Sequence, residues 1–225
     1  MYRNIAFSVD EFYHIYNRGT DKRIIFCDEY DYNRFILQLY LCNNTEPVDL
    51  GDLLRQGTSL SEIFSIKKVD TLVEIGAWVL MPNHFHILIK EKVDGGISTF
   101  MKKLLTSYSM YFNRKYHRTG SLFEGLFKAR HLDYDQYLKY QFAYIHLNPI
   151  SLIEPAWKDK TIFDREKAKD FLKEYLYSSY SDYCGNERPQ NNILNKEAFP
   201  EYFESFFDFK EMIREWLDFN SGDEV

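Results

Sequence analysis

The sequence predicts an α+β fold in which one antiparallel sheet carries helices on one face. Runs rich in β-forming residues occur at 12–16, 71–81 and 84–91 and within 122–131. Amphipathic helical patterns separate the first run from the second and the third from the fourth. The resulting order, strand–helix–strand–strand–helix–strand, is the split βαβ or ferredoxin-like arrangement, and a helical C-terminal extension follows it.

The first half of this arrangement has clear boundaries. The strand at 12–16 ends at a glycine turn formed by Asn17, Arg18 and Gly19. Asp28 is expected to cap a helix that extends to about Cys42, because apolar residues then recur at helical spacing. Residues 43–68 are polar and punctuated by glycine, so they predict a connecting insertion with a short helix.

The second half begins with two strands joined by a turn at Pro82 and Asn83. Ser98 is the expected N-cap of the long helix that follows, and the polar stretch 118–121 ends this helix. After the fourth strand, Asp133 or Asp135 can cap another helix. That helix should end near residue 148, because the residue before a proline avoids helical geometry.

The length of 225 residues suits one domain with an appendage. We therefore predict a domain over residues 1–185, with the insertion at about 43–68, and an acidic helical extension over residues 186–225. The last 25 residues contain eight acidic and two basic residues, and apolar residues recur among them on a helical pattern.

Composition narrows the classes of protein that fit. Three cysteines without C-x-x-C spacing argue against a disulfide framework or a thiolate zinc site. No apolar run approaches the roughly 18 residues of a membrane-spanning helix, and no signal peptide is recognisable. We expect a cytoplasmic protein without a membrane partner. The net charge is −6, but residues 84–130 hold nine basic and three acidic residues, so the charge is polarised along the chain.

Two histidines in the third strand are the first candidate site. His84 and His86 stand two residues apart, so they project from one face of the strand, with Phe85 and Ile87 on the other. Two imidazoles fixed side by side form half of a metal site. A pair of half-buried, hydrogen-bonded histidines is the alternative interpretation of an isolated His-x-His.

The helix after the fourth strand supplies the second candidate. Its packing stripe consists of Leu138, Phe142 and Ile145. Tyr144 lies roughly 120° from that stripe, and Asn148, one turn later, lies on the same side. A boundary tyrosine and a helix-ending asparagine are the structural alternative for this pair.

Five short stretches stand out along the chain: YHIYNRG at 13–19, MPNHFH at 81–86, GSLFEG at 120–125, YIHLNP at 144–149 and YSSY at 177–180. Together they resemble the REP-associated tyrosine transposases, within the HUH superfamily of single-strand DNA transposases and nickases. They occur in the order of that family and lie within residues 10–185. Residues 43–68 and 162–174 look like insertions, and the segment from residue 186 onward has no matched counterpart.

The resemblance implies roles for individual residues. His84 and His86 match the histidine pair that holds a divalent cation, and Tyr144 matches the nucleophile. Asn148 matches a polar residue that supplies a further metal ligand in some members. The implied activity is cleavage and strand transfer of single-stranded hairpin DNA through a 5′-phosphotyrosine, without a nucleotide cofactor.

The two histidines, the asparagine amide and the tyrosine have the chemical properties that cleavage of a phosphodiester requires. A cation held by two imidazoles and an amide oxygen keeps open positions for a phosphate oxygen and offsets developing charge. Magnesium prefers oxygen ligands and manganese accepts imidazole more readily, so we expect Mg²⁺ or Mn²⁺ as the cofactor. A tyrosine is mostly protonated at pH 7, and alignment with the scissile bond supplies much of the missing reactivity.

Other residues are rivals or helpers on sequence grounds. The further histidines His14 and His131 could assist proton transfer. The rival helical tyrosines, which do not match the family's nucleophile, are Tyr108, Tyr111 and Tyr140. A tyrosine on a helix reaches the exposed, flexible backbone of single-stranded DNA more readily than the backbone of a stacked duplex. The residues expected to contact DNA phosphates are Arg18, Lys102, Lys103, Arg114, Lys115, Arg118, Lys128 and Arg130.

Competing functions differ in what they require of these residues. A domesticated relative that binds hairpin DNA as a structural or regulatory protein would not need both histidines and Tyr144. A hydrolytic metallophosphoesterase would use water as its nucleophile and tolerate Tyr144→Phe. A monomer and a homodimer, in which Tyr144 completes a partner's site, are both open.

Overall fold

The computed structural model describes residues 5–157, 162, 164–202 and 206–218. Within these residues, four antiparallel strands form one sheet in the order β2-β3-β1-β4. With the intervening helices, this is the predicted split βαβ, ferredoxin-like topology. The strands are β1 (Phe12–Arg18), β2 (Val73–Met81), β3 (His84–Glu91) and β4 (Lys128–His131).

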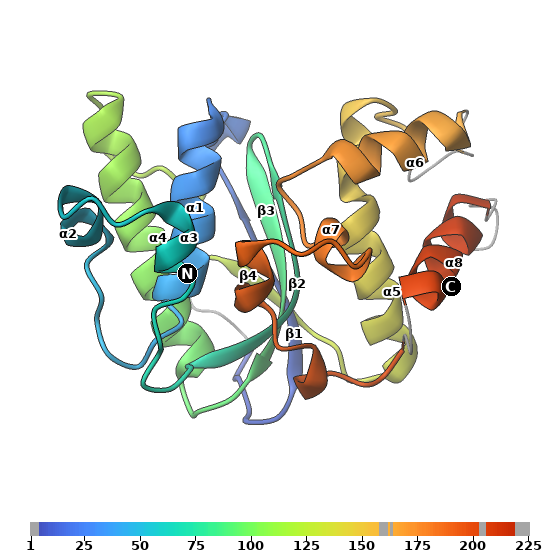
Figure 1. Ribbon diagram of the computed structural model, residues 1–225, viewed down its shortest axis with the longest axis horizontal. Coiled ribbons are helices and arrows are strands. Elements are labelled where there is room, and N and C mark those ends of the chain that lie inside the picture. Colours follow the sequence, from blue (N-terminus) through green and yellow to red (C-terminus); the bar gives the residue numbers. More distant parts are fainter. Residues whose placement is uncertain (1–4, 158–161, 163, 203–205, 219–225) are drawn as a thin grey trace.

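One face of the sheet is covered by α1 (Glu29–Leu41) and α4 (Gly96–Lys115), as predicted (Figure 1). Alternation along the strands sends Ile15, Phe85 and Ile87 into this layer, where they are fully buried. Asp28 caps α1 as expected, because its side chain accepts a hydrogen bond from the backbone N–H of Asp31.

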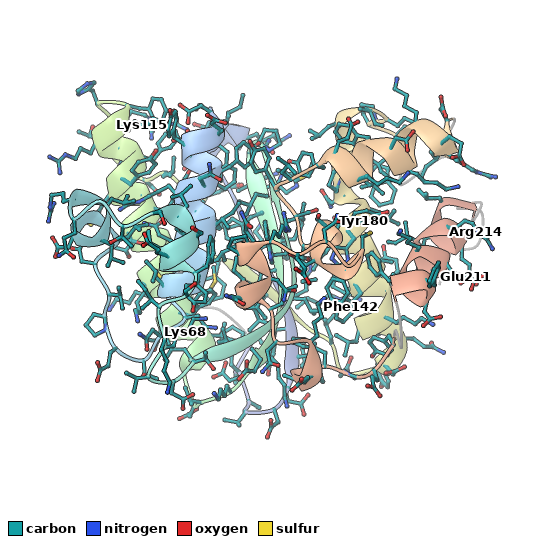
Figure 2. All side chains as sticks on the ribbon, viewed as in Figure 1. Lys68, Lys115, Phe142, Tyr180, Glu211 and Arg214 are labelled. Atoms are coloured by element: carbon teal, nitrogen blue, oxygen red, sulfur yellow. The ribbon has the colours of Figure 1, made fainter. Side chains whose placement is uncertain are left out.

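The opposite face is also covered, which extends the prediction of helices on one face. The helix α5 (Asp135–Leu147) lies against this face, and two of the later elements, the 3₁₀ turn Asn148–Leu152 and α8 (Phe206–Asp218), contact α5 (Figure 1). Phe142 on α5 and Tyr180 belong to this second core (Figure 2). The later elements are the 3₁₀ turn Asn148–Leu152, α6 (Arg165–Glu174), α7 (Tyr180–Tyr183), the 3₁₀ turns Pro189–Ile193 and Lys196–Ala198, and α8 (Phe206–Asp218).

Two predicted helix caps are wrong. The helix α4 begins at Gly96 with Gly95 as its N-cap, so Ser98 lies inside the first turn. Gly95 has φ 70°, and a Cβ on Gly96 would lie 2.2 Å from the Leu72 carbonyl oxygen, so the two glycines bring the helix start against β2. The N-cap of α5 is Tyr134, which makes no side-chain cap hydrogen bond, in place of Asp133 or Asp135.

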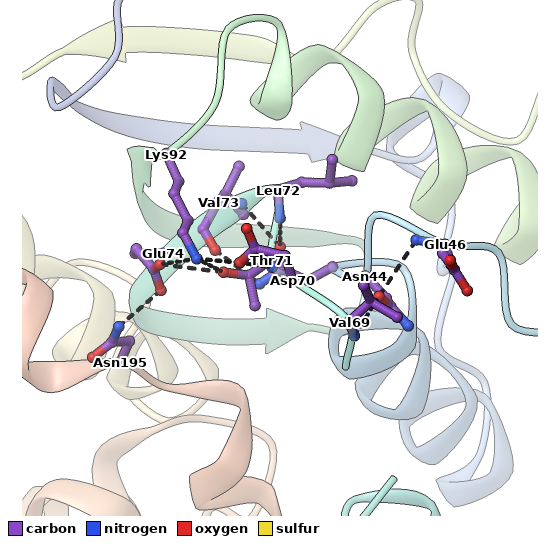
Figure 3. Close-up of polar contacts among 11 residues, drawn as sticks. Asn44, Glu46, Val69, Asp70, Thr71, Leu72, Val73, Glu74, Lys92 and Asn195 are labelled. Atoms are coloured by element: carbon purple, nitrogen blue, oxygen red, sulfur yellow. Dashed lines mark hydrogen bonds and ion pairs between the residues drawn. The ribbon is translucent and has the colours of Figure 1, made fainter. Parts of the chain in front are cut away.

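The connection between α1 and β2 contains two short helices, α2 (Leu50–Arg55) and α3 (Leu60–Ile63), where one was expected. A polar cluster fastens the end of this connection to the sheet and to the C-terminal segment (Figure 3). Lys92 forms ion pairs with Asp70 and Glu74 at 2.5 and 3.4 Å. Asn195 donates a hydrogen bond to Glu74 at 2.9 Å, so the C-terminal segment contacts the start of β2.

The helix α8 is amphipathic, as its sequence pattern predicts. Phe209, Met212, Ile213 and Leu217 are buried in the second core, whereas the neighbouring Phe207 is 67% exposed. A part of the predicted apolar pattern, residue 203, lies outside the described residues. The domain boundary at residue 185 stays a prediction. No helix in the described part of the chain is long and apolar enough to span a membrane.

Candidate functional site

The face of the sheet under α5 carries the predicted histidines. His84 and His86 lie on β3 with ring centroids 5.0 Å apart and nearly perpendicular planes. Phe85 and Ile87 point to the opposite layer, as the alternation predicts. His86 is 6% exposed, whereas His84, at the first position of the strand, is partly exposed. The pair therefore lies at the start of β3, at the boundary between the core and the surface.

Each of the two histidine rings forms a hydrogen bond through its Nδ1 atom. The Nδ1 of His84 lies 2.6 Å from the Oδ1 of Asn83, and the Nδ1 of His86 lies 2.8 Å from the Nε2 of His14. A neutral imidazole has one donor and one acceptor nitrogen. With Nδ1 of each ring engaged inside the protein, Nε2 is the nitrogen through which each histidine would bind a cation.

Tyr144 reaches this histidine pair from α5. Its ring lies edge to face with His86, at a centroid distance of 5.4 Å and an interplanar angle of 87°. It also lies 6.0 Å from the ring of His14 and 6.4 Å from that of Trp157. The helix α5 directs Leu138 and Ile145 into the second core, which leaves Tyr144 at the boundary of that core, facing the histidines. The two predicted halves of the site thus meet.

Asn148 is the third predicted ligand. The α-helix ends at Leu147, as the position of Pro149 predicts, but Asn148 keeps helical angles, φ −53° and ψ −37°, so the expectation that it avoids helical geometry is wrong. The chain continues instead into the 3₁₀ turn Asn148–Leu152. Asn148 is 1% exposed, and its Nδ2 has no hydrogen-bond partner among the described residues. A buried amide with an unsatisfied donor is uncommon in a folded protein. Its position one turn after Tyr144 is as predicted; its role as a ligand stays a prediction.

The donor set fits a divalent cation with open coordination positions. Two neutral imidazoles and an amide oxygen are acceptable ligands for Mn²⁺ and leave room for phosphate oxygens. Among the described residues, no group of three or more His, Cys, Asp or Glu gathers to hold a metal ion.

The rival tyrosines on α4 lie on the other face of the sheet. Tyr108 is fully buried, donates a hydrogen bond to the Ile25 carbonyl oxygen, and has a pKa raised well above the ordinary value by burial. Tyr111 donates to the Asp31 carboxylate at 3.0 Å. Tyr140, on α5, is 41% exposed and lies 6.1 Å from the ring of Tyr144. Only Tyr140 of the three is therefore near the predicted nucleophile.

Three of the predicted DNA-contacting residues lie near the histidines. Arg18 pairs with His84 across the β1–β3 ladder, and its guanidinium forms an ion pair with Glu124, which lowers the pKa of that carboxyl. Lys128 and Arg130 are exposed on β4 and stand opposite Tyr16 and His14, so they share the face of the histidines. Accordingly, the Arg130 guanidinium lies 5.2 Å from the ring of Tyr137, near the start of α5.

The other five lie on or just after α4, on the opposite layer. Lys103 donates to the Asn44 carbonyl oxygen, and burial lowers its pKa. Lys115, at the end of α4 (Figure 2), has a raised pKa: burial opposes the charge, but ion pairs with Asp28 and Asp31 outweigh it. Arg118 donates to Asn113. Lys102 and Arg114 are exposed. The structure thus separates these five residues from the histidine pair.

Sequence reasoning missed the contacts made by β1. The sequence suggests only a role in proton transfer for His14, yet this residue is 7% exposed and hydrogen-bonded to His86. Tyr16 stacks on His14 with centroids 4.9 Å apart and planes 22° apart. The alternation in YHIY places His14 and Tyr16 on one face, but only the strand pairing shows which residues they meet. His131 faces Tyr13 and bonds to Glu11, away from the site.

Comparisons with known proteins bear on this geometry. Residues 53–148 match the family model described as IS200-like transposase, a segment that includes His84, His86, Tyr144 and Asn148. No curated protein matches the chain. A solved structure of a REP-associated tyrosine transposase bound to a REP hairpin is 12% identical, with a TM-score of 0.47, over 100% of this chain and 98% of that chain. The family match over residues 53–148 supports the resemblance drawn from the sequence: this segment is similar to the IS200-like transposases.

Proposed function

We propose that this protein cleaves and rejoins single-stranded DNA beside a hairpin, with Tyr144 as the nucleophile and a divalent cation at His84 and His86. The observation that carries the proposal is the edge-to-face contact of Tyr144 with His86 at 5.4 Å. Tyr144 comes from a helix and the two histidines come from a strand. The sequence predicts these two groups separately, and the rings of Tyr144 and His86 lie in contact. The match to IS200-like transposases over the segment that contains them supports the same chemistry.

The reaction requires one bond to form and one to break. The Tyr144 hydroxyl oxygen attacks the phosphorus of a phosphodiester, forms a 5′-phosphotyrosine and expels the 3′ oxygen, which takes up a proton. The tyrosine proton passes to water. Because the bond energy is retained, the 3′-hydroxyl can reverse the step or another 3′-hydroxyl can attack, so no nucleotide cofactor is needed.

The protein's own residues arrange this reaction. His84 and His86 would hold the cation through Nε2, with the Asn148 amide as a further ligand. When bound, Mn²⁺ or Mg²⁺ would polarise the phosphate and offset the charge that develops on it. Packing of α5 on the sheet fixes the direction of the Tyr144 side chain, so less orientational freedom must be lost in the transition state.

The substrate class follows from access and charge. Tyr144 lies on a helix packed against the sheet, and an exposed, flexible strand reaches such a residue more readily than a stacked duplex. Arg18, Lys128 and Arg130 lie on the same side as the site and suit phosphate contacts.

The experiment is an adduct assay with labelled single-stranded hairpin oligonucleotides from the flanks of the native gene, in Mn²⁺. Wild type, Tyr144→Phe and His84→Ala are compared on denaturing gels that separate protein–DNA adducts. We expect an adduct with wild type that is absent from both variants and from samples that contain EDTA. Tyr144→Phe removes only one oxygen, so the variant should keep its fold and its DNA affinity.

Two results would contradict the proposal. Cleavage that persists in Tyr144→Phe would assign the attack to water or to another tyrosine. Hairpin binding without any adduct from wild type would indicate a protein that binds DNA without cleaving it.

A further inference from the structure

The hydrogen bond between His14 and His86 joins two neighbouring strands inside the protein. The Nε2 of His14 lies 2.8 Å from the Nδ1 of His86. The side chains are 7% and 6% exposed, and their rings stack with centroids 4.9 Å apart and planes 24° apart. The ring of Tyr16 stacks on His14 with centroids 4.9 Å apart and also lies 5.8 Å from the ring of His86. The orientation of His86 is therefore fixed by residues of β1.

The hydrogen bond between the two rings limits the tautomers in which His86 can bind a cation. A histidine ligand must present a lone pair to the cation, and a neutral imidazole has only one unprotonated nitrogen. If the Nε2 of His86 carries that lone pair, its Nδ1 bears the proton and donates it to His14. His14 then accepts at Nε2 and carries its own proton on Nδ1.

We infer that His14 is a positioning residue for the cation site: it holds His86 in the orientation and tautomer in which Nε2 binds the cation. The inference rests on the proposed metal-dependent function. Asn83 does for His84 what His14 does for His86, since the Asn83 Oδ1 lies 2.6 Å from the Nδ1 of His84. Such partners of metal-binding histidines typically fix ring orientation and raise ligand basicity.

The two partners differ in origin. Asn83 is the residue directly before His84, so their contact is local. His14 comes from the neighbouring strand, 72 residues away in sequence, so its contact depends on the pairing of β1 with β3. The cation site is thereby coupled to correct assembly of the central strands.

The test measures Mn²⁺ affinity by calorimetry on metal-free full-length protein, without DNA. His14→Ala should weaken Mn²⁺ binding roughly 10- to 100-fold, the usual effect of removing such a partner. His14→Gln should restore most of this loss, because its amide oxygen can accept the proton of His86. His84→Ala, which removes a ligand, should lose measurable binding. His131→Ala should leave the affinity unchanged, since His131 lies on the other face of the sheet.

A second readout separates positioning from direct ligation. The absorption spectrum of bound Co²⁺ reports the number and kind of ligands. We expect His14→Ala, at saturating Co²⁺, to keep the shape of the wild-type spectrum. Thermal melting of the metal-free variants checks that each has folded, and His14→Gln provides the comparison if His14→Ala has not.

Specific outcomes would overturn the inference. Equal Mn²⁺ affinity for wild type and both His14 variants would remove any role for this residue at the site. An altered Co²⁺ spectrum in His14→Gln would make His14 itself a ligand. Either result leaves the adduct assay with Tyr144 untouched. Wild-type protein that binds no Mn²⁺ would instead contradict the metal-dependent function, and the role of His14 with it.

Discussion

The ring of Tyr144 meets that of His86 edge to face, with centroids 5.4 Å apart. One residue comes from a helix and the other from a strand, and 57 residues lie between them in sequence. The contact exists because α5 packs on the face of the sheet that α1 and α4 leave uncovered. The added second layer, beyond the split βαβ unit, is therefore what places the predicted nucleophile at the histidine pair.

The nearest rival nucleophile allows a matched test. Tyr140 lies one turn before Tyr144 on α5, is 41% exposed and contacts Trp216 at 5.1 Å. No ring contact places Tyr140 against His86 in the described structure, unlike Tyr144. We expect Tyr140→Phe to form the DNA adduct within about twofold of the wild-type rate, whereas Tyr144→Phe forms none. Gel quantification of the two variants side by side decides between them, and loss of the adduct in Tyr140→Phe would reassign the nucleophile.

The positions of the basic residues predict a difference in salt dependence. Lys128 and Arg130 share the face of the histidines, while Lys102 is exposed on the opposite layer. Replacing either β4 residue by alanine should weaken single-strand binding and reduce the slope of log affinity against log salt by roughly 0.7, the value for one lost phosphate contact. Lys102→Ala should change neither quantity. Fluorescence anisotropy across a salt series measures both.

The opposite pattern would also be informative. If Lys102→Ala weakens binding and the β4 variants do not, the DNA lies across α4, as the sequence alone allowed. The proposed route of the strand past Lys128 and Arg130 would then be wrong.

Local sequence signals predicted the parts of this structure that depend on neighbouring residues. Alternation in β3 placed His84 and His86 on one face and Phe85 on the other. The Asp28 cap followed from a single side chain and a helical pattern. The start of α4 was misplaced because Gly95 and Gly96 begin the helix through backbone geometry and close approach to β2, which a search for a Ser or Asp cap overlooks.

Contacts between distant segments could not be predicted in the same way. The bond from His14 to His86 depends on the register of β1 with β3, and a shift of one residue would send His14 to the other face. The count of basic residues along the chain likewise placed Lys102 and Lys128 in one predicted DNA-binding set. In the structure, Lys102 lies on α4 and Lys128 lies on β4, on the face of the histidines. Sequence proximity does not reveal which face of a sheet a helix covers.

The packing of α8 predicts a contrast between neighbouring phenylalanines. Phe209 is fully buried in the second core, 5.1 Å from the ring of His146, whereas Phe207 is 67% exposed. Phe209→Ala should lower the free energy of unfolding by about 3–5 kcal/mol through lost burial and the cavity left behind. Phe207→Ala should stay within about 0.5 kcal/mol of wild type. Urea unfolding measures both, and equal effects would show that α8 does not pack on α5 as described.

His146 predicts how stability depends on pH. It is fully buried, with Nε2 2.7 Å from the Ser179 hydroxyl and Nδ1 2.9 Å from the Phe142 carbonyl oxygen. Burial lowers its pKa from 6.5 to about 3. Below pH 6.5 the unfolded chain therefore binds a proton that the folded protein does not, and stability falls as the pH falls toward 3. At pH 5 the loss from this group is about 2 kcal/mol.

A variant without the titrating ring isolates this contribution from that of the carboxylates. His146→Gln should cost stability at pH 8, but its free energy of unfolding should approach that of wild type as the pH falls from 6.5 to 5, because only wild type must keep a buried imidazole neutral. The exposed His117, at φ 50°, serves as the control, since asparagine tolerates this backbone conformation. His117→Asn should show no comparable convergence with wild type. Urea titrations at pH 8, 6.5 and 5 provide the comparison, and a constant difference between wild type and His146→Gln at all three would mean that His146 is not held neutral in the core.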